Sequence, residues 1–229
     1  MDEAHRGQIF TGTPGLPYAL QFGTIGTIDG CDDLYPQRGV LLLSQLDTIL
    51  EFNEAFIAER AYEPLRTDRL PKKQLAVLSC MDTRLLELLP RSMNLHNGDA
   101  KIIKTAGALI GDPFDSTMRS LLVGIYELGV EEVLVVGHYG CGMAGINADT
   151  VLGKMAQRGI AQETITTLGH AGVDLHRWLA PLSSIPDSVA HTVETIRNHP
   201  LVPPTVPVHG LVIDPETGKL DLVNRDPKA

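Results

Sequence analysis

Five residues with metal-binding or acid–base side chains follow two apolar runs of the sequence. Cys80, Asp82 and Arg84 lie at the end of the run AVLSC and just after it, and His138 and Cys141 follow the run EEVLVVG. Apolar runs of this length and composition are typical of buried β-strands. Residues two apart in an extended segment point to the same side. We therefore predict that the two strand ends deliver these five side chains to one site.

Two thiols and an imidazole are a typical ligand set for zinc. The spacing His138-x-x-Cys141 lets one loop reach a metal ion from two sides, and Cys80 completes a His/Cys/Cys set. Thiolate and imidazole ligands favour zinc over hard cations such as Mg²⁺. Three protein ligands also leave the fourth position open, as in catalytic zinc sites. A single buried cysteine or histidine is most often structural, so the hypothesis depends on the combination.

The sequence leaves two roles open for Asp82 and Arg84. In the first, the Asp82 carboxylate takes the fourth position and closes the metal site. In the second, Arg84 holds the carboxylate away from the metal through paired hydrogen bonds, and Asp82 orients a metal-bound water. A plain ion pair at a strand end is the structural alternative to both.

A competing motif overlaps the second ligand pair. Residues 140–145, GCGMAG, form a G-x-G-x-x-G that follows a predicted strand and precedes a predicted helix, as in dinucleotide-binding proteins. That function requires a further strand bearing an acid about 20 residues on. Residues 159–167 show no strand pattern, so we rank this hypothesis second. A cysteine phosphatase loop is excluded because Leu86 stands where its arginine would be needed.

The order of elements predicts an α/β fold with a parallel crossover. A strand, a loop, a helix and a second strand follow one another, which is typical of right-handed parallel units. The helix from residue 44 carries an apolar stripe that we expect to pack on a core or on a partner subunit. The predicted strands are 76–80, 100–104, 132–137, 206–213 and 219–223, and the predicted helices are 44–59, 85–89, 115–128, 144–158 and 187–198, with shorter segments at 163–168 and 174–179.

The first 43 residues differ in composition from the rest. They are rich in glycine and proline and lack any helical or strand period, so they cannot bury enough apolar surface to fold alone. We interpret 1–43 as an N-terminal arm, either a flexible tail or a segment lying across a neighbouring subunit, and 44–229 as one domain. A third hypothesis is that translation begins near residues 40–43. Cys31 lies in the arm without neighbours that suggest a site.

Composition excludes several classes of function. The chain has 229 residues and a formal net charge of −9, which argues against a nucleic-acid partner. The start of the chain lacks a secretory pattern, and every apolar run is shorter than a membrane span. Three cysteines at wide spacing fit a reducing compartment. We therefore expect a cytoplasmic protein with neither a nucleic-acid nor a membrane partner.

The sequences CMDTR at 80–84 and HYGCG at 138–142 resemble the motifs of the β-class carbonic anhydrases. Between them, a predicted strand ends in Ala106-Gly107, as in that family. The resemblance runs from about Leu46 to Val223 and includes the segments at 196–200 and 208–214. Residues before 40 lie outside it, and Ala108 departs from the residue that many members carry.

The resemblance implies a mostly parallel central sheet flanked by helices, with a C-terminal antiparallel edge strand. It implies a homodimer or dimer of dimers with sites at the subunit interface. One Zn²⁺ per subunit would be bound by Cys80, His138 and Cys141. Asp82 would be a fourth ligand in a closed, inactive form and would be released to Arg84 in the open form.

The implied activity is the reversible hydration of carbon dioxide to bicarbonate and a proton by zinc-bound hydroxide, the reaction of a carbonate dehydratase. Ala106, Gly107 and Gly142 are expected in the substrate pocket. Because two thiolates cancel the charge of the metal, activity is expected to rise on the alkaline side. The alternatives are hydrolysis of carbonyl sulfide or carbon disulfide, and a non-catalytic zinc-binding or sensor protein. The candidates for a proton relay, among which the sequence does not select, are His5, His96, His170, His176 and His191.

Overall fold

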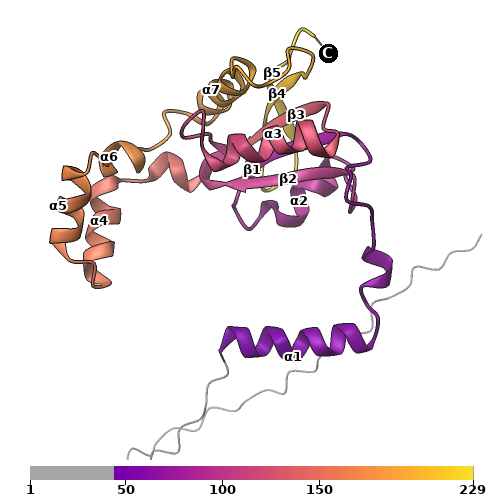
Figure 1. Cartoon of the computed structure of the whole chain (residues 1–229), viewed down its shortest axis with the longest axis horizontal. Helices are drawn as coiled ribbons and strands as arrows, with labels where there is room; N and C mark the ends of the chain where they lie inside the picture. The colour runs from indigo at the N-terminus through magenta and orange to yellow at the C-terminus, as the bar shows by residue number, and fades with distance from the viewer. Residues whose placement is uncertain (1–43, 229) are drawn as a thin grey trace, which may run out of the picture. The chain divides into compact units, whose positions relative to one another are not determined.

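A five-stranded mixed sheet forms the centre of the computed structural model, which describes residues 44–228. The strand order is β2-β1-β3-β4-β5; the first four strands are parallel and β5 pairs antiparallel with β4 (Figure 1). This confirms the predicted fold class. The strands are β1 (Leu75–Cys80), β2 (Ala100–Thr105), β3 (Glu132–His138), β4 (Val208–Ile213) and β5 (Leu220–Asn224).

The longer helices begin at residues whose side chains cap their first turn. The Asp115 carboxylate accepts a hydrogen bond from the Met118 amide, and the Ser184 hydroxyl accepts one from the Asp187 amide. Gly129, in the left-handed conformation, ends the helix that Asp115 begins. The α-helices are α1 (Gln45–Ala58), α2 (Leu85–Ser92), α3 (Ser116–Leu128), α4 (Ala148–Gln157), α5 (Gln162–His170), α6 (Leu175–Trp178) and α7 (Ile185–Arg197), with short 3-10 turns η1 (Glu63–Leu65), η2 (Ala106–Ala108) and η3 (Gly142–Gly145).

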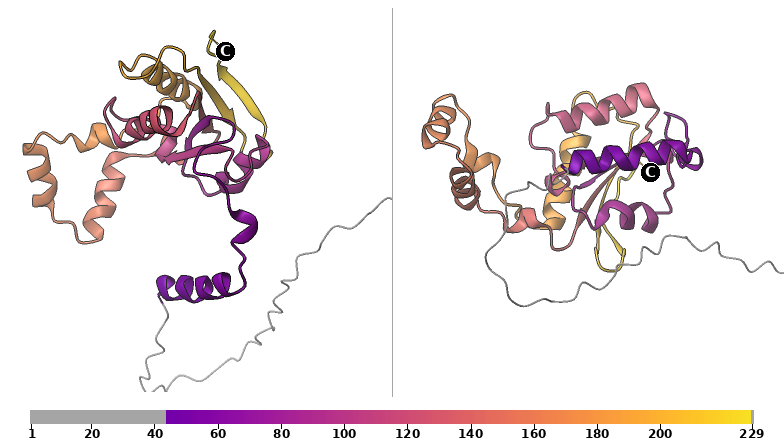
Figure 2. Two further views of the ribbon diagram at one scale, coloured as in Figure 1. Left: turned by 45° about the vertical axis from the view of Figure 1, so that its right-hand side comes forward. Right: turned by 90° about the horizontal axis from the view of Figure 1, so that it is seen from below.

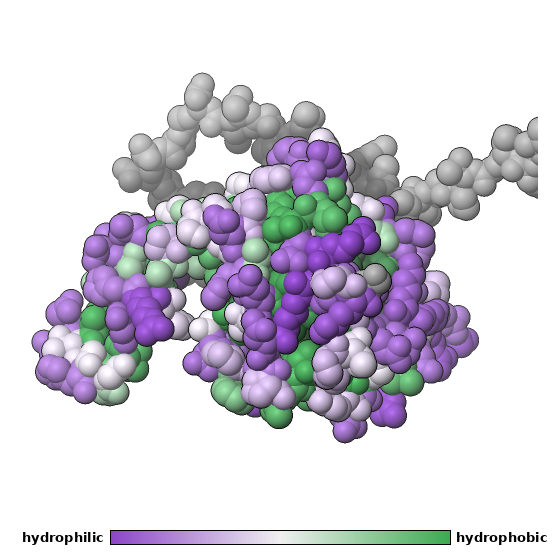
Figure 3. Space-filling model, turned by 90° about the horizontal axis from the view of Figure 1, so that it is seen from above, coloured by the Kyte–Doolittle hydropathy of each residue, from purple (hydrophilic) through white to green (hydrophobic). Residues whose placement is uncertain are grey.

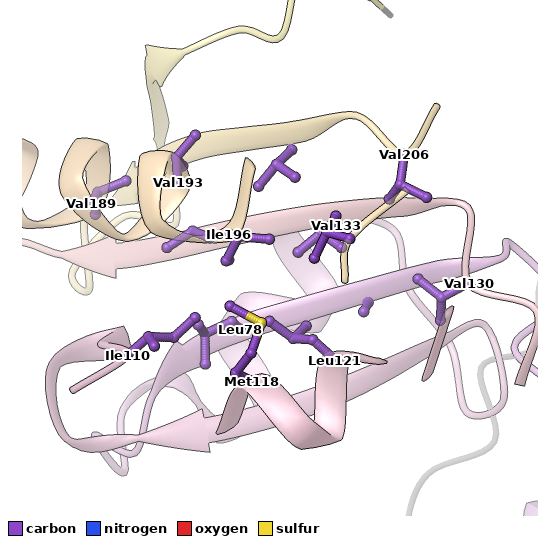
Figure 4. Packing of buried hydrophobic residues seen from close by; sticks show 14 of the residues in the cluster. Leu78, Ile110, Met118, Leu121, Val130, Val133, Val189, Val193, Ile196 and Val206 are labelled. Atoms are coloured by element: carbon purple, nitrogen blue, oxygen red, sulfur yellow. The ribbon is translucent and has the colours of Figure 1, made fainter. Parts of the chain in front are cut away.

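Both faces of the sheet are buried under helices. All six residues of β1 are buried, which explains their continuous apolar pattern. Alternate residues such as Ala76 and Leu78 pack with α3 and α7 on one face (Figure 4), whereas Leu75 and Val77 pack with Leu85 of α2 on the other. The sheet is thereby fixed between two apolar layers, and its carboxyl edge is held in a defined position.

Two predicted helix boundaries were wrong. The helix after β1 was expected to end before Pro90, but α2 continues through Pro90 to Ser92. A single proline removes one backbone hydrogen bond, and the burial of Leu85 and Leu89 holds this short helix in place. The helix expected from residue 144 begins instead at Ala148, because the Asn147 side chain accepts a hydrogen bond from the Thr150 amide and caps it there.

The chain between β3 and β4 contains a projecting lobe formed by α4, α5 and α6. The views of Figures 1 and 2 agree that these helices extend away from the sheet, and none of their residues is buried. The lobe therefore adds nothing to the main core.

Apolar patches separated by hydrophilic surface are visible on the face of the molecule shown in Figure 3.

Helix α1 carries the predicted apolar stripe. Leu46, Ile49 and Leu50 are each more than half exposed, and none of the side chains of α1 is buried. Its first turn is capped reciprocally by Ser44 and Asp47. The arm at 1–43, with Cys31 and His5, lies outside the described residues. Within residues 44–228, no helix has both the length and the hydrophobicity needed to cross a bilayer.

Helix α7 packs so closely on β4 that position 210 has room only for a glycine. A β-carbon at Gly210 would lie 2.8 Å from Val189 Cγ1 and 3.2 Å from Val193 Cγ2. Because both valines are core residues of α7, we expect Gly210→Ala to lower the free energy of unfolding by about 1–3 kcal/mol in chemical denaturation. The control is Gly153→Ala in α4, where a β-carbon meets nothing within 4 Å; it should gain roughly 0.5–1 kcal/mol from helix propensity. Equal stability of Gly210→Ala and the wild type would contradict this packing.

Candidate metal centre

The pairing of β1 with β3 brings the two predicted motifs together. The strands are parallel neighbours, with Ser79 opposite Val136, so Cys80 and His138 lie at the same carboxyl edge of the sheet. Gly140, with φ of 65°, then turns the chain, a conformation that glycine adopts without steric cost. The turn returns Cys141 to the site beside Cys80.

Three potential metal ligands converge at this edge. One ligand atom from each of Cys80, His138 and Cys141 lies within 4.8 Å of the other two, and all three residues are buried. The two sulfur atoms are 3.8 Å apart. Atoms at such separations can share one coordination sphere.

His138 shows the clearest sign that the cluster fits a metal ion. Its Nδ1 lies 3.0 Å from the Tyr139 carbonyl oxygen, to which it donates as an N–H, so Nε2 is the nitrogen left to bind a ligand. Nε2 is buried, lacks a hydrogen-bond partner in the described chain, and lies 3.7 Å from Asp82 Oδ2. A buried polar atom without a partner is costly, and a hydrogen bond at Nδ1 is the usual way to orient a ligating imidazole.

Asp82 is held by Arg84 through three hydrogen bonds. Arg84 Nε donates to Oδ1 at 3.0 Å, Nη2 donates to Oδ2 at 2.9 Å, and the Arg84 amide donates to Oδ1 at 2.9 Å. Arg84 Nη1 also lies 3.7 Å from Glu216 Oε1. In the structure Arg84 binds the carboxylate, and the role of Asp82 toward a metal-bound water stays a prediction.

These contacts alter the pKa values of the charged groups. Hydrogen bonding from the Arg84 side chain lowers the pKa of Asp82 to about 2, and the same contact raises the pKa of Arg84. Burial raises the pKa of the Cys141 thiol, and the nearby Cys80 thiol adds to this effect. Binding of a metal by the thiolate must therefore displace a proton from Cys141.

A cavity of about 360 Å³ opens onto the cluster. It contains the three potential ligands and Asp82, and much of the rest of its wall is apolar. Met143 is fixed there because its carbonyl oxygen accepts a hydrogen bond from the Leu182 amide at 3.1 Å. The remaining lining residues are Met81, Thr83, Ala106, Gly142, Met143 and Ile146.

The predicted pocket residues are only partly found in this wall. Ala106 and Gly142 line the cavity. Gly107 is buried behind it, where a β-carbon would lie 3.3 Å from Met143 Cγ. Ala108 adopts a left-handed conformation with φ of 58°, which is uncommon for a residue other than glycine. Met143 and Ile146 have no chemical signature in the sequence, and only the fold places them at the cavity.

Other hypotheses can be compared with the structure. None of the described relay candidates, His96, His170, His176 and His191, lines the cavity at the cluster. In the described chain, β3 is followed by helices up to β4, so the strand required by a dinucleotide-binding G-x-G-x-x-G is missing. Gly140 makes the turn to Cys141, and Gly142 and Gly145 begin and end the 3-10 turn η3 that follows it.

Comparison with known proteins identifies the family. A family model described as carbonic anhydrase matches residues 75–220. The chain belongs to the β-carbonic anhydrase family. It is 55% identical over 178 residues to YvdA of Bacillus subtilis, covering 78% of this chain and 90% of that protein. The crystal structure of a β-carbonic anhydrase of Trichomonas vaginalis matches with a TM-score of 0.73 and 35% identity, covering 80% of this chain and 99% of that one.

The family also contains relatives with another activity. A carbon disulfide hydrolase of Acidithiobacillus thiooxidans is 31% identical over 156 residues, which cover 65% of this chain and 76% of that protein. Membership of the β-carbonic anhydrase family therefore establishes the scaffold and leaves the substrate to be argued from the site.

We expect Cys80→Ser to lose most of the bound metal. The serine hydroxyl is a poor substitute for a thiolate toward zinc, and the remaining two residues cannot hold the ion firmly. Elemental analysis of purified protein would measure this, with Cys31→Ser as a matched control that retains full metal. Stoichiometric zinc in Cys80→Ser would exclude Cys80 as a ligand.

The Arg84 contacts also predict the titration of Asp82. In Arg84→Gln, the carboxylate loses its charged partner, so the pKa of Asp82 should rise from about 2 toward 3.8. Carbon-detected NMR titration of the metal-free protein would measure it. Arg91→Gln, which removes only the exposed pair with Glu87, should leave Asp82 unchanged. A pKa that stays near 2 in Arg84→Gln would show that another group stabilises the carboxylate.

Proposed function

We propose that this protein is a zinc-dependent carbonate dehydratase that hydrates carbon dioxide reversibly to bicarbonate and a proton. The observation that carries the proposal is the buried Cys80, His138 and Cys141 cluster beside an Asp82–Arg84 pair, in a chain of the β-carbonic anhydrase family. Two sulfur ligands and one nitrogen favour one Zn²⁺ per subunit. Zinc bound by such a set lowers the pKa of a water ligand toward neutrality and supplies the nucleophile for carbon dioxide.

The residues around the cluster have separate roles in this proposal. Cys80, His138 and Cys141 would hold the metal, and Asp82 would accept a hydrogen bond at the site. Because Arg84 engages both carboxylate oxygens, Asp82 is oriented without having to coordinate the ion. Its low pKa keeps it ionised at neutral pH.

The apolar wall suits a small apolar substrate. Met143, Ile146 and Ala106 line the cavity and limit the water that can compete there. Gly142 and Ala106 leave room beside the three cluster residues, whereas Gly107 shapes the wall from behind. Two thiolates offset the charge of the metal, so we expect activity to rise with pH above neutrality.

We also propose a homodimer or a dimer of dimers. Helix α1 has an uncovered apolar stripe. Edge strand β2 exposes Ile102, which lines the same surface pocket as the exposed Leu86 of α2. Burial of such surfaces by a second copy would remove apolar area from water. Sedimentation equilibrium tests this, and a monomer at micromolar concentration would contradict it.

Free thiols at Cys80 and Cys141 suit the reducing cytoplasm that we propose as the location.

The second candidate function is hydrolysis of carbon disulfide or carbonyl sulfide. It is supported by the related carbon disulfide hydrolases and by a cavity wall that would accept either substrate. A non-catalytic zinc protein or sensor would instead keep Asp82 on the metal at every pH. The contact of both Asp82 oxygens with Arg84 favours a site open to a substrate.

Stopped-flow carbon dioxide hydration and sulfide release from carbon disulfide, measured on the same zinc-loaded sample, test the proposal. We expect hydration to be the faster reaction. Sulfide release without hydration would assign the second function, and the absence of both would favour the non-catalytic protein.

Asp82→Asn tests the role of the carboxylate. The amide keeps the shape of the side chain but removes its negative charge and replaces one accepting oxygen by an NH2 donor. Hydration should therefore slow by roughly 100-fold, while zinc content is unchanged. Stopped-flow rates between pH 6 and 9 would measure the effect, with Asp149→Asn on the exposed surface of α4 as the control. Equal rates for Asp82→Asn and the wild type would remove Asp82 from the mechanism.

A further inference from the structure

The wall of the cavity at the cluster contains two methionines that are held differently. Met81 and Met143 both line this cavity. Met81 is 66% exposed, so most of its side chain faces solvent. Met143 is half-buried and packs against the apolar cluster that includes Cys80 and Cys141. Met143 is therefore the methionine that lies against the proposed metal ligands.

The space behind Met143 is filled by closely packed groups. A β-carbon at Gly107 would lie 3.3 Å from Met143 Cγ and 3.3 Å from Leu182 Cδ1, so these side chains contact the glycine directly. The Leu182 amide also donates to the Met143 carbonyl oxygen at 3.1 Å. Methionine is ordinarily an adaptable side chain, but here both its backbone and its Cγ are fixed from behind. Met143 has little room to move away from the cavity.

The size of the cavity, rather than its polarity, can distinguish carbon dioxide from its sulfur analogues. Carbon dioxide and carbon disulfide are both linear, neutral and apolar, and the apolar atoms of Met143, Ile146 and Ala106 suit either molecule. Sulfur is larger than oxygen and forms a longer bond to carbon, so the analogues need more room. A side chain that cannot yield makes this difference count, because inserting extra atoms against a fixed wall is unfavourable.

We propose that Met143 is the specificity-determining residue of this cavity. It limits the width beside the cluster so that carbon dioxide is favoured over carbonyl sulfide and carbon disulfide. The inference rests on the proposed function and names the substrate within the two candidates that the family allows. Gly107 and Leu182 are positioning residues, since they act only through Met143.

Binding of cyanate and thiocyanate to the cobalt-substituted protein tests this. Both probes are linear ions with one negative charge, and they differ in carrying oxygen or sulfur, as carbon dioxide and carbonyl sulfide do. Both bind metal ions and change the visible spectrum of cobalt. In Met143→Ala, the ratio of thiocyanate affinity to cyanate affinity should rise about tenfold, the typical effect of one methylene of space in an apolar pocket.

Two further variants are the controls. Met143→Leu keeps most of the volume of the side chain, so the ratio should stay within roughly threefold of the wild type. Met81→Ala removes the same atoms from the exposed part of the same cavity and should leave the ratio unchanged. Cobalt content and thermal unfolding are measured for every variant, which separates a wider cavity from a disrupted site.

Three results would overturn the proposal. An unchanged ratio in Met143→Ala would show that this side chain does not limit size. An equal rise in Met81→Ala would show that the fixed position of Met143 is unimportant. Loss of cobalt from Met143→Ala would make Met143 part of the scaffold of the metal site. The ratio does not depend on turnover, so failure of the proposed function, seen as absence of carbon dioxide hydration by the wild type, would be recognised separately.

Discussion

Burying two thiols and an imidazole within 4.8 Å of one another costs free energy that other interactions must offset. The unpartnered Nε2 of His138 would be satisfied by water if it were exposed, and a buried polar atom without a partner destabilises a protein. A divalent cation would give the ligand atoms of all three residues a partner at once. The parallel pairing of β1 and β3 and the turn at Gly140 are the features that bring these residues together.

The rest of the site follows from the separation of charge within it. Asp82 is engaged by Arg84 on both oxygens, so a carboxylate lies close to His138 without being free to neutralise an incoming ion. Lys104 approaches Cys80 from the neighbouring strand through a carbonyl oxygen. The charged groups near the cluster are thus held in place by hydrogen bonds, while Met143 and Ile146 keep the cavity wall apolar.

Much of this arrangement could be predicted from the sequence because chemical type and spacing carry the information. Cys80, His138 and Cys141 follow buried strands, and the order of strands and helices fixes which strand ends meet. Lys104 could not be found in this way, since a lysine in a short strand usually lies on the surface and only the register with Ser79 places it beside Cys80. Helix α2 continues through Pro90 because of packing, and α4 begins late, at Ala148, because Asn147 caps it. Local propensity contains neither effect.

The long crossover between β3 and β4 has a consequence for the order of assembly. The chain leaves the sheet at His138 and returns only at Val208, with the lobe of α4, α5 and α6 between them. Closing so long a connection is slow compared with pairing strands that are near in sequence. During synthesis, β1, β2 and β3 leave the ribosome before β4, and all three cluster residues emerge with them. The three potential metal ligands are therefore all synthesised before the strand that completes the parallel part of the sheet.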